Sequence, residues 1–166
     1  IQQLAKRHSW IDATRVGIWG HSGGGFASTR ALLTFPDFYK VAVSQAGNHD
    51  NRNYADEWGE KYHGVEVKNE DGASNYDSQA NQLSVESLKG KLLIAHGTTD
   101  TNVSPYNTLI VVEALMKANK DFDMLMLPNR GHGFAREPYM MRKRWDYFVA
   151  HLMGATPPKE FVFSEK

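Results

Sequence analysis

A short glycine-rich run, Gly20-His21-Ser22-Gly23-Gly24, constrains the fold of this chain more than any other feature. It follows a β-branched apolar stretch at residues 15–19 and precedes a stretch with helical periodicity at residues 26–35, which Pro36 ends. Glycines at this spacing allow a strand to turn sharply into a helix, and they leave the central residue at the apex of the turn. The run therefore predicts a strand–turn–helix unit that presents Ser22.

Three further short apolar runs, at residues 39–44, 91–96 and 122–127, predict additional strands. Stretches with helical periodicity alternate with these runs. Strands that alternate with helices are joined by crossover connections and form a parallel sheet. The sequence therefore predicts the α/β class, with a parallel sheet flanked by helices.

Two helices in the second half of the chain complete this pattern. Ser104 and Pro105 suit the start of the first one, because serine caps the first turn and proline fits the first helical position. Its apolar face is expected to consist of Leu109, Val112, Leu115 and Met116. The second helix is expected from about residue 137 to 153, with its core side chains at Met141, Trp145, Phe148 and Leu152.

The composition excludes several classes of function. The 166 residues, of which 41% are apolar and 23% charged, suffice for one soluble globular domain. Nineteen basic and nineteen acidic residues leave no net charge to attract nucleic acid or an anionic membrane surface, and no apolar run is long enough to cross a bilayer. The absence of cysteine rules out disulfides and cysteine-metal sites.

One domain is expected over residues 1–154, followed by a tail at 155–166. Residues 47–90 fit neither the strand nor the helix period and are too many for a plain connection. We expect this segment to pass over the edge of the sheet, near the active site. The chain opens at Ile1 with neither a methionine nor a signal peptide, which indicates the interior of a longer protein.

Ser22, Asp100 and His132 follow the order of serine, acid and histidine that α/β-hydrolases use. Asp100 lies just after the third predicted strand and His132 just after the fourth, and the carboxyl ends of parallel strands meet at one edge of a sheet. In such a triad His132 takes the proton of Ser22, and Asp100 holds the His132 ring in the correct tautomer. The backbone N–H of Gly23 is expected to stabilise the oxyanion.

The remaining histidines and one basic run have structural explanations. We expect His21 to act as a spacer within the turn and His96 to make structural hydrogen bonds. His49 and His63 show no spacing typical of a metal site, so neither a metal nor another cofactor is expected. The run Arg142-Lys143-Arg144 is interpreted as a solvated helix face.

A wider resemblance joins these motifs. The chain carries IDATRVGIWGHSGG at residues 11–24, HGTTDTNV at 96–103 and GHG at 131–133. Together they resemble the prolyl oligopeptidase family of serine peptidases, and within it the dipeptidyl-peptidase IV-like branch. The resemblance runs from about residue 2 to 152 and implies the C-terminal part of a catalytic α/β-hydrolase domain.

The resemblance implies a peptidase that forms an acyl-enzyme and releases dipeptides after proline or alanine. By position, Asn102 would hold a carbonyl of the substrate, and Val103 would form a wall of the small pocket for proline or alanine. Tyr54 and Trp58 stand at the positions of the aromatic walls, which suit a proline ring. The branch usually has a tyrosine where this chain has Gly23, so a strict proline preference is not implied.

The resemblance also implies segments N-terminal to this chain. These are the first strands of the sheet, a loop with a second oxyanion donor and a β-propeller that gates the site. It favours a periplasmic or extracellular location. Three functions stay open at this point: a peptidase with peptide substrates, a carboxylesterase or acyl hydrolase of the same fold, and an inactive fragment that forms a homodimer through an exposed edge strand.

Overall fold

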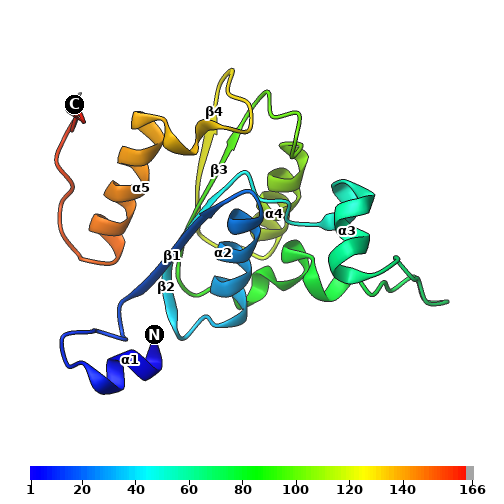
Figure 1. The fold of residues 1–166 in the computed structure, drawn as a ribbon, viewed down its shortest axis with the longest axis horizontal. Coiled ribbons are helices and arrows are strands. Elements are labelled where there is room, and N and C mark those ends of the chain that lie inside the picture. The colour runs from blue at the N-terminus through cyan, green and yellow to red at the C-terminus, as the bar shows by residue number, and fades with distance from the viewer. Residues whose placement is uncertain (164–166) are drawn as a thin grey trace.

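The computed structural model describes residues 1–163 and contains a sheet of four parallel strands in the order β1-β2-β3-β4 (Figure 1). The strands are β1 (Val16–His21), β2 (Tyr39–Gln45), β3 (Lys91–Gly97) and β4 (Asp123–Leu127). Each of them overlaps one of the predicted apolar runs. The predicted α/β class, a parallel sheet flanked by helices, is confirmed.

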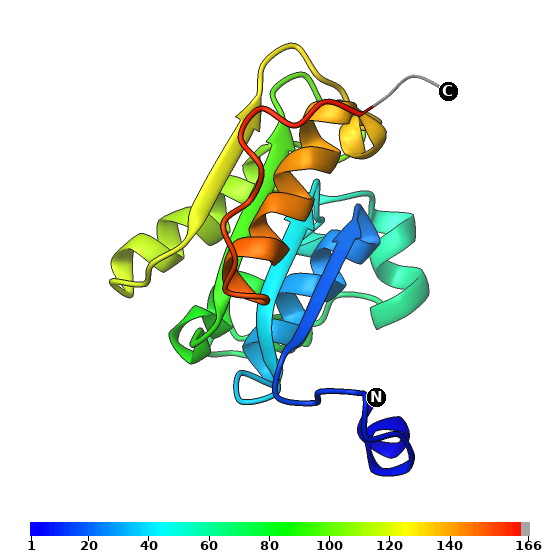
Figure 2. The same cartoon turned by 90° about the vertical axis from the view of Figure 1, so that its left-hand side faces the viewer.

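Helices cover both faces of the sheet. The helices are α1 (Gln2–Arg7), α2 (Gly23–Thr34), α3 (Asp56–His63), α4 (Tyr106–Lys117) and α5 (Pro138–His151). Helix α5 lies on one face, while α2 and α4 lie on the other (Figure 2). The central strands β2 and β3 are thus buried on both sides, which explains why their sequences are apolar without strict alternation.

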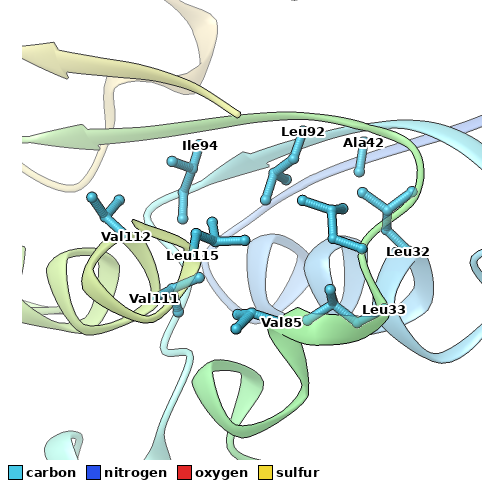
Figure 3. Close-up of a cluster of buried hydrophobic side chains, with 10 residues drawn as sticks. Leu32, Leu33, Ala42, Val85, Leu92, Ile94, Val111, Val112 and Leu115 are labelled. Carbon is cyan, nitrogen blue, oxygen red and sulfur yellow. The ribbon is translucent and has the colours of Figure 1, made fainter. Parts of the chain in front are cut away.

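Two apolar clusters hold these layers together. The larger one joins the sheet to α2 and α4 (Figure 3) and contains Leu32, Leu33, Ala42, Val85, Leu88, Leu92, Ile94, Val111, Val112 and Leu115. The other joins the sheet to α5 and contains Val41, Val43, Ala46, Leu93, Ala95, Leu127, Phe134, Met140 and Tyr147. Because both clusters use β2 and β3, the carboxyl ends of these strands are fixed by packing from two sides.

The expected apolar face of α4 is partly wrong. Val112 and Leu115 are buried as predicted, but Leu109 is 44% exposed and Met116 is 68% exposed. The helix is rotated because its first turn buries two polar residues, Asn107 and Thr108, which form hydrogen bonds near the ends of the strands. This rotation turns Leu109 and Met116 outwards.

The expected faces of α5 are also only partly right: Phe148 and Leu152 pack against the second cluster as predicted, but two other residues do not lie where they are expected. Trp145, predicted in the core, is 55% exposed, whereas Arg144, predicted on a solvated face, is only 6% exposed. The Arg144 guanidinium lies 3.7 Å from the centre of the Trp19 ring on β1. A cation stacked on an aromatic ring, with its aliphatic stem along the helix, can occupy a buried position that periodicity assigns to an apolar residue.

Residues 47–90 connect β2 to β3 and run partly over a face of the sheet instead of over its edge. The segment contains α3 and then a 3-10 helix at Asn81–Ser87, which packs between α2 and α4. Val85, in this 3-10 helix, belongs to the larger cluster. The returning part of the segment therefore takes the place of a crossover helix, a role that its polar sequence does not reveal.

Residues 155–163 run back along α5 (Figure 2), and residues 164–166 of the predicted tail lie outside the described part. The division into a domain and a tail stays a prediction. None of the helices between residues 1 and 163 combines the length and apolar character of a segment that crosses a bilayer.

The rotation of α4 is tested by two leucines on the same helix. Leu115 has no exposed surface, so Leu115→Ala leaves a cavity and should lower the free energy of unfolding by about 2–5 kcal/mol. Leu109→Ala is the matched control and should cost about 0.5 kcal/mol or less, because this side chain faces solvent. Urea denaturation measures both values, and equal losses would contradict the observed rotation.

Candidate active site

Ser22 lies at the sharp turn between β1 and α2. Its backbone has φ 59° and ψ −123°, a region that residues with a side chain rarely adopt. The Ser22 N–H donates to the carbonyl of Gln45 at 2.8 Å, and the Ser22 carbonyl accepts from the N–H groups of Gly25 and Phe26 at 2.8 and 3.0 Å. The neighbouring strand and the first turn of the helix thus hold this strained conformation.

The glycines of the turn have different roles. A Cβ atom on Gly20 would lie 2.2 Å from the carbonyl oxygen of Gly24, so the strand and the helix approach too closely for any side chain there. Gly23 is the first residue of α2 and is exposed. Within residues 1–163 its N–H donates to no acceptor, which leaves it available to a ligand beside Ser22.

Asp100 and His132 are brought together as the sequence predicts. The side chain of Asp100 is fully buried, and its Oδ2 lies 2.7 Å from His132 Nδ1. Its Oδ1 accepts from the backbone N–H groups of Asn102 and Val103 at 2.9 and 3.0 Å. These donors compensate for the loss of water around a buried carboxylate and fix its orientation.

The contact with Asp100 determines the tautomer of His132. A carboxylate oxygen only accepts, so Nδ1 carries the proton and Nε2 is the basic nitrogen. The His132 side chain is 23% exposed, and its ring centre lies 4.8 Å from that of His21, the residue before Ser22. The Ser22 hydroxyl makes no hydrogen bond with any residue from 1 to 163. Bonds of this kind are often long before a substrate binds.

Gly97 allows the two loops that carry Asp100 and His132 to meet. A Cβ atom on Gly97 would lie 2.2 Å from the carbonyl oxygen of Arg130. The Thr99 N–H donates to that same carbonyl at 3.0 Å. The loop after β3 and the loop after β4 are therefore in backbone contact, and this contact sets the distance between the acid and the base.

His96 and His21 differ in their surroundings. His96 has no exposed surface, with Nδ1 at 2.8 Å from the Thr108 hydroxyl and Nε2 at 2.9 Å from the Val103 carbonyl oxygen. Burial lowers the pKa of His96, and burial together with His132 lowers the pKa of His21. Both rings are thus held neutral at the edge of the site. For His21 the sequence suggests only a spacer, and its contact with His132 could not be inferred from the motif.

Two of the predicted substrate-binding residues are joined directly. The Tyr54 hydroxyl donates to Asn102 Oδ1 at 2.9 Å, and the rings of Tyr54 and Trp58 meet edge to face with centres 6.2 Å apart. Trp58 is 40% exposed, while Val103 has no exposed surface. The aromatic pair is therefore open to a ligand, whereas the Val103 side chain is covered by its neighbours.

Asn107, which the sequence analysis does not single out, positions this aromatic pair. It lies in the first turn of α4, is fully buried and donates to the carbonyl of Asn53 at 2.9 Å. Its Oδ1 accepts from the N–H of Asp50 at 3.2 Å. The segment that leads into Tyr54 is thus bound to α4. The sequence offers only an asparagine in the first turn of a mostly apolar helix, and this does not reveal the role.

His49 and His63 each pair with an asparagine. His49 Nδ1 accepts from Asn81 at 3.0 Å, and His63 lies 2.6 Å from the side chain of Asn51. Among the described residues, no group of three or more His, Cys, Asp or Glu side chains has an arrangement that could hold a metal ion. Complete burial lowers the pKa of His49 to about 3.

Known proteins share this arrangement of elements. The chain is 34% identical over 155 residues to dipeptidyl peptidase 8 of Homo sapiens, which covers 92% of this chain and 16% of that protein. The structure of Porphyromonas gingivalis dipeptidyl peptidase 4 superposes with a TM-score of 0.73 and 31% identity over 84% of this chain and 20% of that one. An acylaminoacyl peptidase structure shares the fold, with a TM-score of 0.76, 21% identity and coverage of 98% and 27%.

The fold is thus that of the α/β-hydrolases. The model of the prolyl oligopeptidase family matches residues 1–155, and the chain belongs to this family. Within the family it fits the dipeptidyl-peptidase IV-like branch. The chain spans about a fifth of the length of the relatives it matches.

The burial of His49 predicts a specific pH dependence of stability. Its folded-state pKa of about 3 lies below its ordinary value of 6.5. At a pH between these two values, His49 is protonated in the unfolded chain but not in the folded chain. Between pH 6.5 and about 3, this residue lowers the free energy of unfolding by up to about 1.4 kcal/mol per pH unit as the pH falls. His49→Asn should flatten this slope.

Urea denaturation between pH 7 and 4.5 measures the slope. His49→Asn keeps an acceptor near Asn81 but cannot be protonated in this range, while the exposed His8→Gln serves as the control and should leave the slope as it is. A slope that His49→Asn leaves unchanged would show that His49 takes up its proton in the folded state.

Proposed function

We propose that this chain carries the catalytic residues of a serine peptidase, with Ser22 as nucleophile, His132 as general base and acid, and Asp100 as the group that orients His132. The observation that carries the proposal is the buried hydrogen bond between His132 Nδ1 and Asp100 Oδ2, at 2.7 Å. This bond leaves Nε2 as the basic nitrogen of His132. The His132 ring packs against His21, next to the strained turn at Ser22. Membership of the prolyl oligopeptidase family supports the assignment.

The chemistry follows from these positions. His132 Nε2 removes the Ser22 hydroxyl proton while Oγ attacks the peptide carbonyl carbon. The carbonyl oxygen becomes negative and accepts from the Gly23 N–H, at the positive end of α2. His132 then gives the proton to the leaving amine nitrogen as the C–N bond breaks. A water molecule attacks the acyl-enzyme by the same route and releases the acid.

The substrate class that we propose is a peptide cleaved after a proline or alanine that is second from its amino terminus. Tyr54 and Trp58 offer a partly exposed aromatic surface for a compact apolar ring. The hydrogen bond from Tyr54 to Asn102 ties this surface to the loop of Asp100. Asn102 is exposed and retains its side-chain amide donor for a substrate carbonyl.

The nucleophile is tested by covalent labelling of the full-length protein with a fluorophosphonate. Ser22→Ala should abolish labelling and lower kcat by about six orders of magnitude, because the nucleophile is lost and the Thr108 hydroxyl, which contacts His96, is fully buried. Ser104→Ala removes another exposed hydroxyl, four residues after Asp100 in the chain, and should leave labelling intact. Labelling that persists in Ser22→Ala would refute the assignment.

The substrate class is tested by comparing Ala-Pro and Gly-Pro amides with p-nitrophenyl esters. Hydrolysis of the amides supports a peptidase, and turnover of the esters alone would contradict it. Trp58→Ala should lower kcat/KM for Ala-Pro amides by about 10- to 100-fold, because an aromatic wall of the pocket is lost. Trp145→Ala, an exposed tryptophan on α5, is the matched control and should leave kcat/KM unchanged.

A further inference from the structure

A second histidine lies against the catalytic acid. His96 Nε2 is 3.3 Å from Asp100 Oδ2, and neither side chain has any exposed surface. The same nitrogen is 2.9 Å from the carbonyl oxygen of Val103. Because a carbonyl oxygen only accepts, His96 Nε2 must carry a proton, and this N–H is shared between the Val103 carbonyl and the carboxylate.

The other ring nitrogen of His96 is fixed from α4. With the proton on Nε2, a neutral ring has an unprotonated Nδ1, which lies 2.8 Å from the Thr108 hydroxyl. Thr108 must therefore donate this hydrogen bond, and it is itself fully buried in the first turn of α4. A helix anchored in the larger apolar cluster thus fixes the orientation of the His96 ring, while the Val103 carbonyl sets its tautomer.

Asp100 Oδ2 consequently faces two imidazole N–H groups, while Oδ1 faces two backbone N–H groups. We propose that His96, held by Thr108, is a positioning residue for the triad: it keeps Asp100 Oδ2 directed at His132 and takes up part of the charge on that oxygen. The role rests on the proposed function and acts through Asp100, since His96 has no exposed surface with which to touch a substrate.

The neutrality of His96 matters to this role. The titratable groups that act on its surroundings come from the ends of all four strands: Asp100, His132, His21 and His49. Only Asp100 is an acid, so the cluster holds a single negative charge. A neutral His96 donates a hydrogen bond without cancelling that charge, which remains to stabilise the His132 imidazolium.

The test uses the full-length protein and the rate of fluorophosphonate labelling at Ser22 as a function of pH. His96→Leu removes the second donor, and Thr108→Val removes the group that fixes the ring. Both should slow labelling by about 10- to 100-fold, because Oδ2 keeps its contact with His132 but is positioned less precisely once the His96 donor is removed or no longer fixed. Both should also move the acidic limb of the profile up by about half a pH unit, because Asp100 then stabilises protonated His132 more strongly.

One conservative variant and one control separate positioning from simple loss of packing. His96→Gln keeps an N–H near the place of Nε2 and should return both the rate and the acidic limb towards those of the unmodified protein. Val111→Ala, one turn further along α4 and equally buried, lowers stability without touching the network and should not move the limb.

The proposal is overturned if His96→Leu and Thr108→Val leave the acidic limb in place, or if His96→Gln behaves like His96→Leu. Labelling of the unmodified protein tests the proposed function by itself. A failure confined to the variants therefore counts against the positioning role alone.

Discussion

The hydrogen bond between His132 and the buried carboxylate of Asp100 sets the requirements that the rest of this structure meets. A carboxylate without contact with water is stable only when donors surround it. Here two backbone N–H groups satisfy one oxygen, and His132 satisfies the other. This arrangement requires the loops after β3 and β4 to touch, which is why Gly97 lies against the Arg130 carbonyl.

Helix α4 links the apolar core to the site. Its middle turns bury Val111 and Leu115 in the larger cluster, and its first turn buries Asn107 and Thr108 beside the loops that carry the candidate residues. Asn107 binds the segment that leads into Tyr54, while Thr108 binds His96. Packing that stabilises the fold therefore also fixes polar groups at the carboxyl ends of the strands, where the precision required is greatest.

The sequence is sufficient to predict the strands and the pairing of Asp100 with His132. The strands are recognisable because β2 and β3 are buried on both faces, and the pairing follows from the order of motifs at the ends of strands. The faces of α4 and α5 could be predicted only in part. Periodicity assigns apolar residues to the core, but Thr108 and Arg144 are buried by hydrogen bonding and by stacking on Trp19.

The route of residues 47–90 could not be predicted for a related reason. Its polar residues are bound by partners that lie far away in the chain, such as Asn107, and its return packs only a few apolar side chains, including Val85, against the sheet. Local patterns contain no information about such contacts. The same holds for His96, whose place beside Asp100 depends on the geometry of the loop between them.

The central claim is that Asp100 fixes the tautomer of His132 so that Nε2 faces the nucleophile. Nitrogen-15 NMR of the histidine rings, recorded at a pH at which His132 is neutral, tests this claim most directly. The account predicts a protonated Nδ1 and an unprotonated Nε2 on His132, and loss of this preference in Asp100→Ala. A proton found on Nε2 in the unmodified protein would contradict it.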